Sequence, residues 1–344
     1  MYMANTENRE QSNLSADLRA ILRCTACRSR VEEGAQGYAC VSCEKKFPLV
    51  RGVYRFVDGQ EYAASFGWQW HRYSKTQLDT GGTISDEAFR KRTGIRPQEL
   101  GGKLILDVGC GMGRFAEVAT RWGARVVGID LSAACEVAAR NLGDRPFVAL
   151  QADVLNLPFA PESFDCIYSI GVLHHTPNCE QAFKSLPQYL KPGGTIAIWL
   201  YSGYNKWYRF SDIYRKVTRR TSPRVLNAFF SVAVPVLYRL DRGLRVVPGV
   251  GKPIAGVVHH VFPVNLRPEP ELRLLDTLDW YSPEYQSKHT YEEVFRWFEA
   301  CGLDSLTVGE LTLGMRGRKP LRTGQRLEED RQLQAVAAGD ARNP

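Results

Sequence analysis

The chain has 344 residues, of which 44% are hydrophobic, so its composition allows a folded protein with a sizeable core. No segment holds 18 uninterrupted apolar residues and the polar N-terminus has no apolar signal region, which excludes a spanning helix and indicates a cytoplasmic protein. Residues 203–252 hold eleven Lys or Arg and two Asp, a net charge of +9 against +8 for the whole chain, so the basic character is local.

Four cysteines near the N-terminus are spaced as two pairs. Cys24 and Cys27 form one C-x2-C pair, and Cys40 and Cys43 form the second, with twelve residues between them. Two such pairs present four thiolates, which complete a tetrahedral zinc site without an open position. We therefore predict a structural zinc ribbon over 21–58, in which the metal supplies much of the folding energy. The alternative is a set of buried free thiols. The polar segment before the ribbon, over 1–20, is predicted to be disordered.

An aromatic connector over residues 59–100 follows the ribbon. Its rings are concentrated in residues 66–73, and Gln77 follows shortly after. One interpretation is a helix that packs onto the next domain. The other is a lid, with Trp70, Tyr73 or Gln77 facing a cofactor and excluding water from it.

The most informative segment covers residues 105–130. An apolar run leads into Gly109, Gly111 and Gly113, and a helical pattern and a second apolar run ending at Asp130 follow. Glycines at alternate positions allow a sharp turn that a ligand can approach closely. A carboxylate 17 residues after the last glycine can accept hydrogen bonds from both hydroxyls of a ribose. The order strand, glycine turn, helix, strand therefore predicts a nucleotide-type cofactor site at the edge of a parallel sheet.

The glycine pattern is G-x-G-x-G, not the G-x-G-x-x-G of dinucleotide sites, and Asp107 precedes it. With this pattern the segment resembles the class I S-adenosylmethionine-dependent methyltransferases. Further matches follow in order over residues 103–201: a strand ending at 151–154, a strand over 163–169, a loop over 172–177 and a Pro-Gly-Gly turn before a strand over 196–200. The resemblance implies an α/β, Rossmann-like fold with a seven-stranded, mostly parallel sheet and a core over 101–202.

The resemblance also implies roles for single residues. Asp107 and the glycine turn would line the methionine part of S-adenosylmethionine, Asp130 would hold the ribose, and Asp153 would lie near the adenine amino group. Ile170 and Gly171 would form the floor beside the sulfonium. The complete set of expected donor-binding residues is Asp107, Gly109, Cys110, Gly111, Gly113, Asp130, Leu131, Asp153, Val154, Ile170 and Gly171. Residues 47–56 resemble the end of the zinc-ribbon module in small activator subunits of tRNA and translation-factor methyltransferases.

A basic helical insertion is predicted over residues 203–286, before the last strands. Trp207, Phe210, Tyr214 and Val217 fall at helical spacing among basic residues, and the apolar stretch that follows is expected to be broken by Pro235. Such helices can contact an anionic membrane surface, a phosphate-bearing substrate or an RNA backbone, or simply expose a solvated basic face. Residues 287–318 are predicted to complete the core with a helix and two strands, and 319–344 to form a charged tail.

The loop after the fourth core strand holds the candidate general base. His174 or His175 would border the cofactor sulfur, and an imidazole has a suitable pKa near 6.5. The alternative is that the pair only shapes the loop.

We predict an enzyme that methylates an oxygen or nitrogen of a small molecule, such as a secondary metabolite in natural product biosynthesis, a sugar or a lipid-linked compound. S-adenosylhomocysteine would be the product, and peripheral membrane contact through 203–252 is an option. An RNA base methyltransferase is the first alternative, although most of the positive charge lies in the insertion and the ribbon is only mildly basic. A non-catalytic adaptor or membrane-surface protein is the second.

Overall fold

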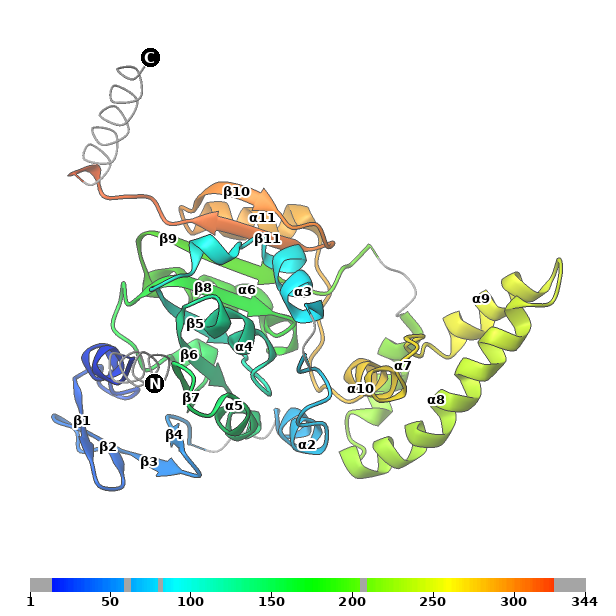
Figure 1. The fold of residues 1–344 in the computed structure, drawn as a ribbon, viewed down its shortest axis with the longest axis horizontal. Coiled ribbons are helices and arrows are strands. Elements are labelled where there is room, and N and C mark those ends of the chain that lie inside the picture. The colour runs from blue at the N-terminus through cyan, green and yellow to red at the C-terminus, as the bar shows by residue number, and fades with distance from the viewer. Residues whose placement is uncertain (1–13, 59–62, 80–82, 205–208, 325–344) are drawn as a thin grey trace, which may run out of the picture.

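The computed structural model describes residues 14–58, 63–79, 83–204 and 209–324 (Figure 1). Its strands are β1 Val31–Gly34, β2 Gly37–Cys40, β3 Lys46–Val50, β4 Val53–Arg55, β5 Leu104–Val108, β6 Arg125–Asp130, β7 Phe147–Gln151, β8 Phe164–Ile170, β9 Leu190–Trp199, β10 Asp304–Val308 and β11 Gly314–Arg318. Its helices are α2 Ala64–Arg72, α3 Ile84–Thr93, α4 Arg114–Arg121, α5 Ala134–Leu142, α6 Cys179–Lys184, α7 Arg209–Thr218, α8 Pro223–Arg245, α9 Gly251–Val261, α10 Pro270–Tyr281 and α11 Tyr291–Ala300. Short 3-10 helices are η1 Pro97–Glu99, η2 Val154–Asn156, η3 Leu173–His175 and η4 Pro187–Tyr189.

The centre of the molecule is a sheet with the order β7-β6-β5-β8-β9-β11-β10. All neighbours from β7 to β9 are parallel, and β11 is antiparallel to both β9 and β10. This confirms the predicted seven-stranded, mostly parallel sheet. Every residue of β5 is buried, as expected for a parallel strand covered on both faces. Leu104, Leu106 and Val108 belong to one apolar cluster and Ile105 to the other, so the sheet separates two core layers.

The cysteine-rich segment continues this sheet and is not a separate body. Strands β1 to β4 pair in sequence as antiparallel neighbours, and β4 then pairs in parallel with β7 through Tyr54–Leu150 and Arg55–Gln151. The rings of Phe47 and Phe56 stack at 4.4 Å between centroids and lie in the same buried cluster as strands β5 and β9. The ribbon therefore shares its hydrophobic core with the central domain.

The prediction of a disordered segment over 1–20 is wrong for its last part. Residues 14–21 form a helix, and the side chains of Leu14 and Leu18 are 0% and 3% exposed. Leu14, Leu18 and Leu22 lie four residues apart, so they form one apolar stripe that packs into the shared core. Residues 1–13 lie outside the described part of the chain.

The insertion consists of helices α7 to α10, and α8 with α9 forms a hairpin that projects from the body (Figure 1). The predicted break at Pro235 is wrong, because α8 continues from Pro223 to Arg245. The missing N–H leaves the carbonyl of Ser231 without its usual helical partner, and Ser231 is exposed, so water can solvate that group. Trp207 lies outside the described residues. None of the described helices is both long and apolar enough to span a bilayer.

The chain then returns to the central sheet. Helix α11 begins with the expected capping box, in which Thr290 accepts from the Glu293 N–H and Glu293 accepts from the Thr290 N–H. Strands β10 and β11 form the antiparallel edge. Of the predicted tail, residues 319–324 are described, and Lys319 and Arg322 both form ion pairs with Glu162.

Candidate functional site

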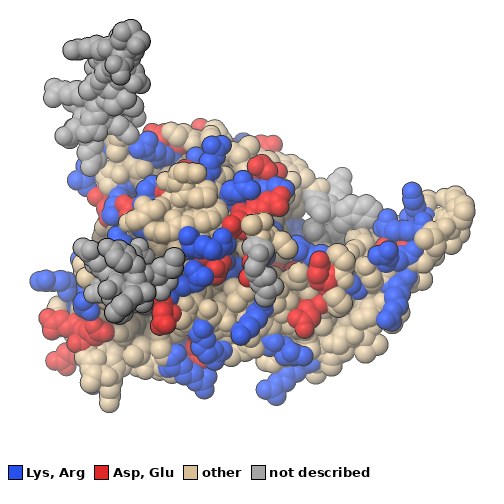
Figure 2. All heavy atoms as spheres, viewed as in Figure 1, with Lys and Arg blue, Asp and Glu red and all other residues tan. Residues whose placement is uncertain are grey.

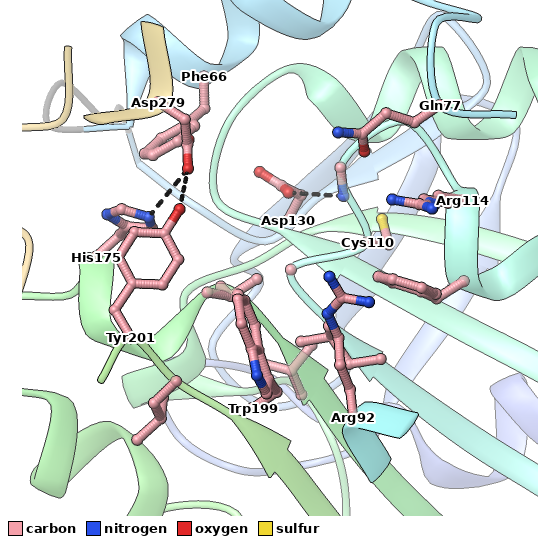
Figure 3. A pocket seen from close by; sticks show the side chains of 18 of the residues that line it. Phe66, Gln77, Arg92, Cys110, Arg114, Asp130, His175, Trp199, Tyr201 and Asp279 are labelled. Carbon is pink, nitrogen blue, oxygen red and sulfur yellow. Dashed lines mark hydrogen bonds and ion pairs between the residues drawn. The ribbon is translucent and has the colours of Figure 1, made fainter. Parts of the chain in front are cut away.

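A cavity of about 740 Å³ opens at the carboxyl ends of β5, β6, β8 and β9 (Figure 3). This is the edge at which parallel sheets bind ligands, and the volume lies in the range of small-molecule sites. The central domain contributes the floor, including Gly109, Cys110, Gly111, Asp130, Leu131, Val154, Ile170 and Gly171. The insertion contributes the opposite wall with Asn265, Arg267, Leu275, Asp276, Asp279 and Trp280.

The glycine turn after β5 leaves its backbone open to the cavity. Gly109 has a φ of 79°, and a Cβ there would lie 2.3 Å from a Val172 methyl carbon. A Cβ on Gly113, the N-cap of α4, would lie 2.2 Å from a Leu142 methyl carbon. Both positions therefore require glycine, the first to shape the floor and the second to let α4 approach α5. Gly113 itself does not line the cavity.

Asp130 closes β6 with its carboxylate at the cavity floor. Its Oδ2 accepts from the Gly111 N–H at 3.0 Å, and its Oδ1 accepts from the Ser132 N–H at 2.9 Å and the Ser132 hydroxyl at 2.7 Å. Burial raises the pKa of Asp130, and these donors oppose that effect. A carboxylate has about four acceptor positions, so one remains for a ribose hydroxyl. The fit to a ribose is therefore good.

Two of the predicted donor-binding carboxylates do not line the cavity. Asp107 lies buried beneath the turn, where burial raises its pKa to about 8, so it is mostly protonated at neutral pH. Asp153 lies between two lining residues, but its side chain accepts from the Leu155 N–H at 2.9 Å and caps η2. Their expected roles at the donor stay predictions.

The connector helix α2 covers part of the cavity. Phe66, Trp70 and Gln77 line it, and the Trp70 indole nitrogen lies 3.3 Å from the position of a Cβ on Gly111. Tyr73 does not line it, because its hydroxyl donates to Asn227 Oδ1 at 2.5 Å and its ring packs against α8. Trp70 and Gln77 therefore border the cavity, while Tyr73 packs on the insertion. That the segment acts as a lid over a cofactor stays a prediction.

The two adjacent histidines differ in their surroundings. His174 is fully buried, has no hydrogen-bond partner at either ring nitrogen within the described structure, and stacks on Tyr201 at 4.0 Å between centroids. It does not line the cavity, and burial lowers its pKa well below the usual value. His175 does line the cavity. Of the two histidines, His175 therefore borders the cavity and His174 does not.

His175 belongs to a polar group that the sequence did not reveal. Its Nδ1 lies 3.0 Å from the Tyr285 carbonyl oxygen, and its Nε2 lies 4.0 Å from Asp279 Oδ2, which also accepts from the Tyr201 hydroxyl (Figure 3). Since the carbonyl requires a proton on Nδ1, the neutral ring carries a free lone pair on Nε2. Burial lowers the pKa of His175 below 6.5, against a smaller opposite effect of Asp279.

Two arginines give one end of the cavity a positive charge. Figure 3 shows Arg92 and Arg114 beside the turn that carries Cys110. Their hydrogen bonds go to neutral groups, the Ala88 carbonyl at 3.1 Å and the Ser85 hydroxyl at 2.9 Å, and neither pairs with a described carboxylate within 4 Å. Burial lowers the pKa of Arg92 to about 10 and also lowers that of Arg114. This end of the cavity is therefore suited to a carboxylate or phosphate group.

An ion pair on the insertion was also not predicted from the sequence. Arg267 forms an ion pair with Asp276 at 2.9 Å, and burial raises the pKa of Asp276 to about 6. Both residues line the cavity, as does Trp199, whose ring lies 4.8 Å from the Arg92 guanidinium carbon.

The four N-terminal cysteines gather at a second site, within the ribbon. Their sulfur atoms all lie within 4.8 Å of one another, and three of the Sγ–Sγ distances are 3.6 Å for Cys24–Cys43, 3.3 Å for Cys27–Cys40 and 3.5 Å for Cys27–Cys43. A tetrahedral zinc with four thiolates requires an edge of about 3.8 Å. The cluster therefore fits the predicted zinc ribbon.

Residues 106–198 match a family model described as a methyltransferase domain. The chain carries a methyltransferase domain. This domain is of the S-adenosylmethionine-dependent class I type, as the motif order and the sheet order indicate.

The methyltransferase domain is similar to proteins that are named for different substrates. The chain is 32% identical over 152 residues to phosphoethanolamine N-methyltransferase 1 of Zea mays, covering 43% of this chain and 30% of that protein. It is 37% identical over 117 residues to probable tRNA methyltransferase 9B of Homo sapiens, covering 33% and 25%. The solved S-adenosylmethionine dependent methyltransferase of Mesorhizobium loti is 33% identical, with 32% and 50% covered and a TM-score of 0.29. The chain spans less than a third of the length of the two curated relatives.

Proposed function

We propose that the protein transfers a methyl group from S-adenosylmethionine to an oxygen or nitrogen of a small molecule. The observation that carries this proposal is that a single cavity joins the glycine floor and Asp130 to His175 and Asp279, which lies on the insertion. The floor fits the donor, and the insertion wall supplies the polar groups that an acceptor needs. The two relatives are named for phosphoethanolamine and for tRNA, so the choice of acceptor class depends on the cavity and on experiment.

The donor supplies an electrophilic sulfonium methyl group, and the protein has to bind, orient and deprotonate. We assign the ribose to Asp130 and the carboxylate of the methionine part to Arg92 and Arg114, which lie beside the glycine turn. Both guanidinium groups belong to half-buried residues and their hydrogen bonds go to neutral groups, so a bound carboxylate would stabilise this end of the cavity.

Replacing Arg114 by glutamine is expected to weaken binding of S-adenosylhomocysteine by about tenfold or more, because a charge-assisted hydrogen bond is lost. Binding of 5′-methylthioadenosine, which has no carboxylate, should change by less than about threefold. Calorimetric titration of both compounds measures the difference. Arg140, which is exposed on α5, provides the control substitution Arg140→Gln. Equal weakening for both compounds would contradict the assignment.

Proton removal is assigned to His175. Its Nε2 lone pair would accept the proton of an acceptor O–H or N–H, while the Tyr285 carbonyl holds the opposite nitrogen in its protonated form. Asp279 would stabilise the imidazolium that results, and the Tyr201 hydroxyl holds Asp279 in place. A positioned base of this kind contributes about 10²–10⁴-fold to the rate.

The test is transfer of an isotope-labelled methyl group to a fractionated extract of small molecules, with total RNA in parallel. Label in a small-molecule fraction is expected, and label only in RNA would contradict the proposed acceptor. His175→Gln should lower kcat about 10²-fold or more with unchanged S-adenosylhomocysteine affinity. His260→Gln, outside the cavity, is the control.

The pH profile gives a separate readout of His175. Since burial lowers its pKa, the imidazole is mostly unprotonated at pH 7. Activity should therefore fall only below about pH 6.5, when the ring gains a proton. This acidic limb should disappear in His175→Gln; a limb that persists unchanged would remove His175 from the mechanism.

We also propose that Cys24, Cys27, Cys40 and Cys43 bind a structural zinc ion. Four thiolate ligands leave no open position for catalysis, so the metal would stabilise the ribbon and take no part in methyl transfer.

A further inference from the structure

The hairpin of α8 and α9 exposes an unusual amount of apolar surface. On α8 the exposed apolar residues are Val225, Phe229, Val232, Val236 and Leu240. At the turn and on α9 they are Val246, Val247, Val250, Ile254 and Val257. Val246 is 79% exposed and Val232 is 69% exposed, so most of each side chain contacts solvent and does not pack in the core. Contiguous patches of this kind mark interaction sites.

The exposed residues of α8 follow the helical repeat. They are three or four residues apart, and at about 100° per residue they fall within about 80° of the helix circumference. A different face of α8 holds Leu226, Phe230 and Val234, which are buried in one cluster with Leu275 and Leu278 of α10. The helix therefore has one apolar face for the body of the protein and a second, unpartnered one.

Basic residues border the unpartnered face. Arg224, Arg239 and Arg242 are exposed and lie within about 80° of the stripe on its far side from the body. The hairpin has one acidic residue, Asp241, and Arg245 already pairs with it at 2.7 Å. Figure 2 shows basic side chains along this hairpin at the side of the molecule. The surface around the stripe is therefore positively charged.

We infer that the α8–α9 hairpin docks on the surface of an anionic phospholipid bilayer, with both helices lying in the interface. In such a stripe the apolar side chains can insert between the acyl chains of the lipids. The arginines beside it can then contact the lipid phosphates. The hairpin projects from the body (Figure 1), so a flat surface can reach it without a clash with the central domain. The charge excess favours an anionic surface over the apolar face of a second copy, whose hairpin carries the same positive charge.

Docking would place the cavity near the membrane. Helix α8 packs on α10, and α10 carries Asp276 and Asp279 into the cavity wall. A lipid-borne acceptor could therefore reach the site without leaving the membrane surface. The docking itself does not depend on the methyltransferase activity.

The test is flotation of the full chain with vesicles of phosphatidylcholine alone and of phosphatidylcholine mixed with phosphatidylglycerol. The protein should float with the mixed vesicles and remain in the dense fraction with phosphatidylcholine alone. The triple variant Phe229→Ser, Val232→Ser, Val236→Ser should lower the bound fraction by about tenfold or more. Arg239→Gln with Arg242→Gln should lower binding about 30-fold at physiological salt and by a larger factor at low salt, where the lost charges are screened less.

Matched controls separate docking from general surface effects. Ile84→Ser with Val308→Ser removes two exposed apolar side chains from the central domain and should leave flotation unchanged. All variants should retain the wild-type thermal unfolding profile. Absence of flotation with anionic vesicles, or equal flotation of wild type and the triple variant, would overturn the inference. A dimer in sedimentation that the triple variant dissolves would assign the stripe to a second copy instead.

Discussion

Asp130→Asn is expected to weaken binding of S-adenosylhomocysteine by about 100-fold or more. The carboxylate would lose its charge-assisted hydrogen bond to a ribose hydroxyl, which is worth about 1.5–3 kcal/mol. The amide would also turn an N–H toward the Gly111 N–H or the Ser132 donors, because all three donate to this carboxylate in the native chain. Calorimetric titration with S-adenosylhomocysteine and with 5′-methylthioadenosine measures the loss, which should be similar for both since both contain the ribose.

Asp153→Asn is the matched control for this result. Asp153 follows the neighbouring strand β7, but its side chain caps η2 and does not line the cavity. Its replacement should change either affinity by less than about threefold. A larger loss of affinity for Asp153→Asn than for Asp130→Asn would contradict the assignment of the ribose to Asp130.

Removal of the metal from the ribbon is expected to unfold more than the ribbon. Zinc in a four-thiolate site contributes about 10–16 kcal/mol, which is comparable with the whole stability of a domain. Because β4 pairs with β7 and Phe47 lies in the shared core, the loss should reach the methyltransferase domain. Cys40→Ser should therefore lower the Tm by about 10 °C or more.

Metal analysis and thermal unfolding check this expectation together. The wild type should contain one zinc per chain, and Cys40→Ser should contain much less. Cys301→Ser, which changes a partly buried cysteine outside the cluster, should keep both the zinc and the Tm within a few degrees. A wild-type chain that folds without zinc and with the same Tm would contradict the proposed structural role.

The floor of the cavity was predictable because its determinants are local. The segment from Ile105 to Asp130 contains two paired strands, the turn between them and the carboxylate, all within one strand–helix–strand unit. Spacing and residue type are sufficient for such a unit. The ribbon cysteines are another local pattern, and the structure brings their four sulfur atoms together.

The opposite wall of the cavity was not predictable from the sequence, because its determinants are not local. Asp279 and His175 meet because α10 folds back over the loop after β8, and no spacing along the chain records that contact. Arg92 lies on α3, a helix whose sequence gave no sign that it borders the glycine turn. The failure at Pro235 has the same origin, since packing of Leu226, Phe230 and Val234 against α10 outweighs one missing backbone donor.

The pairing of β4 with β7 also affects how prone the protein is to aggregation. Without the ribbon, β7 would be a bare sheet edge with a row of unpaired N–H and C=O groups. A strand of another molecule can pair with such an unpaired edge, and this pairing leads to aggregation. Strand β4 pairs with the last two residues of β7, Leu150 and Gln151, so the ribbon covers the carboxyl end of this edge against self-association.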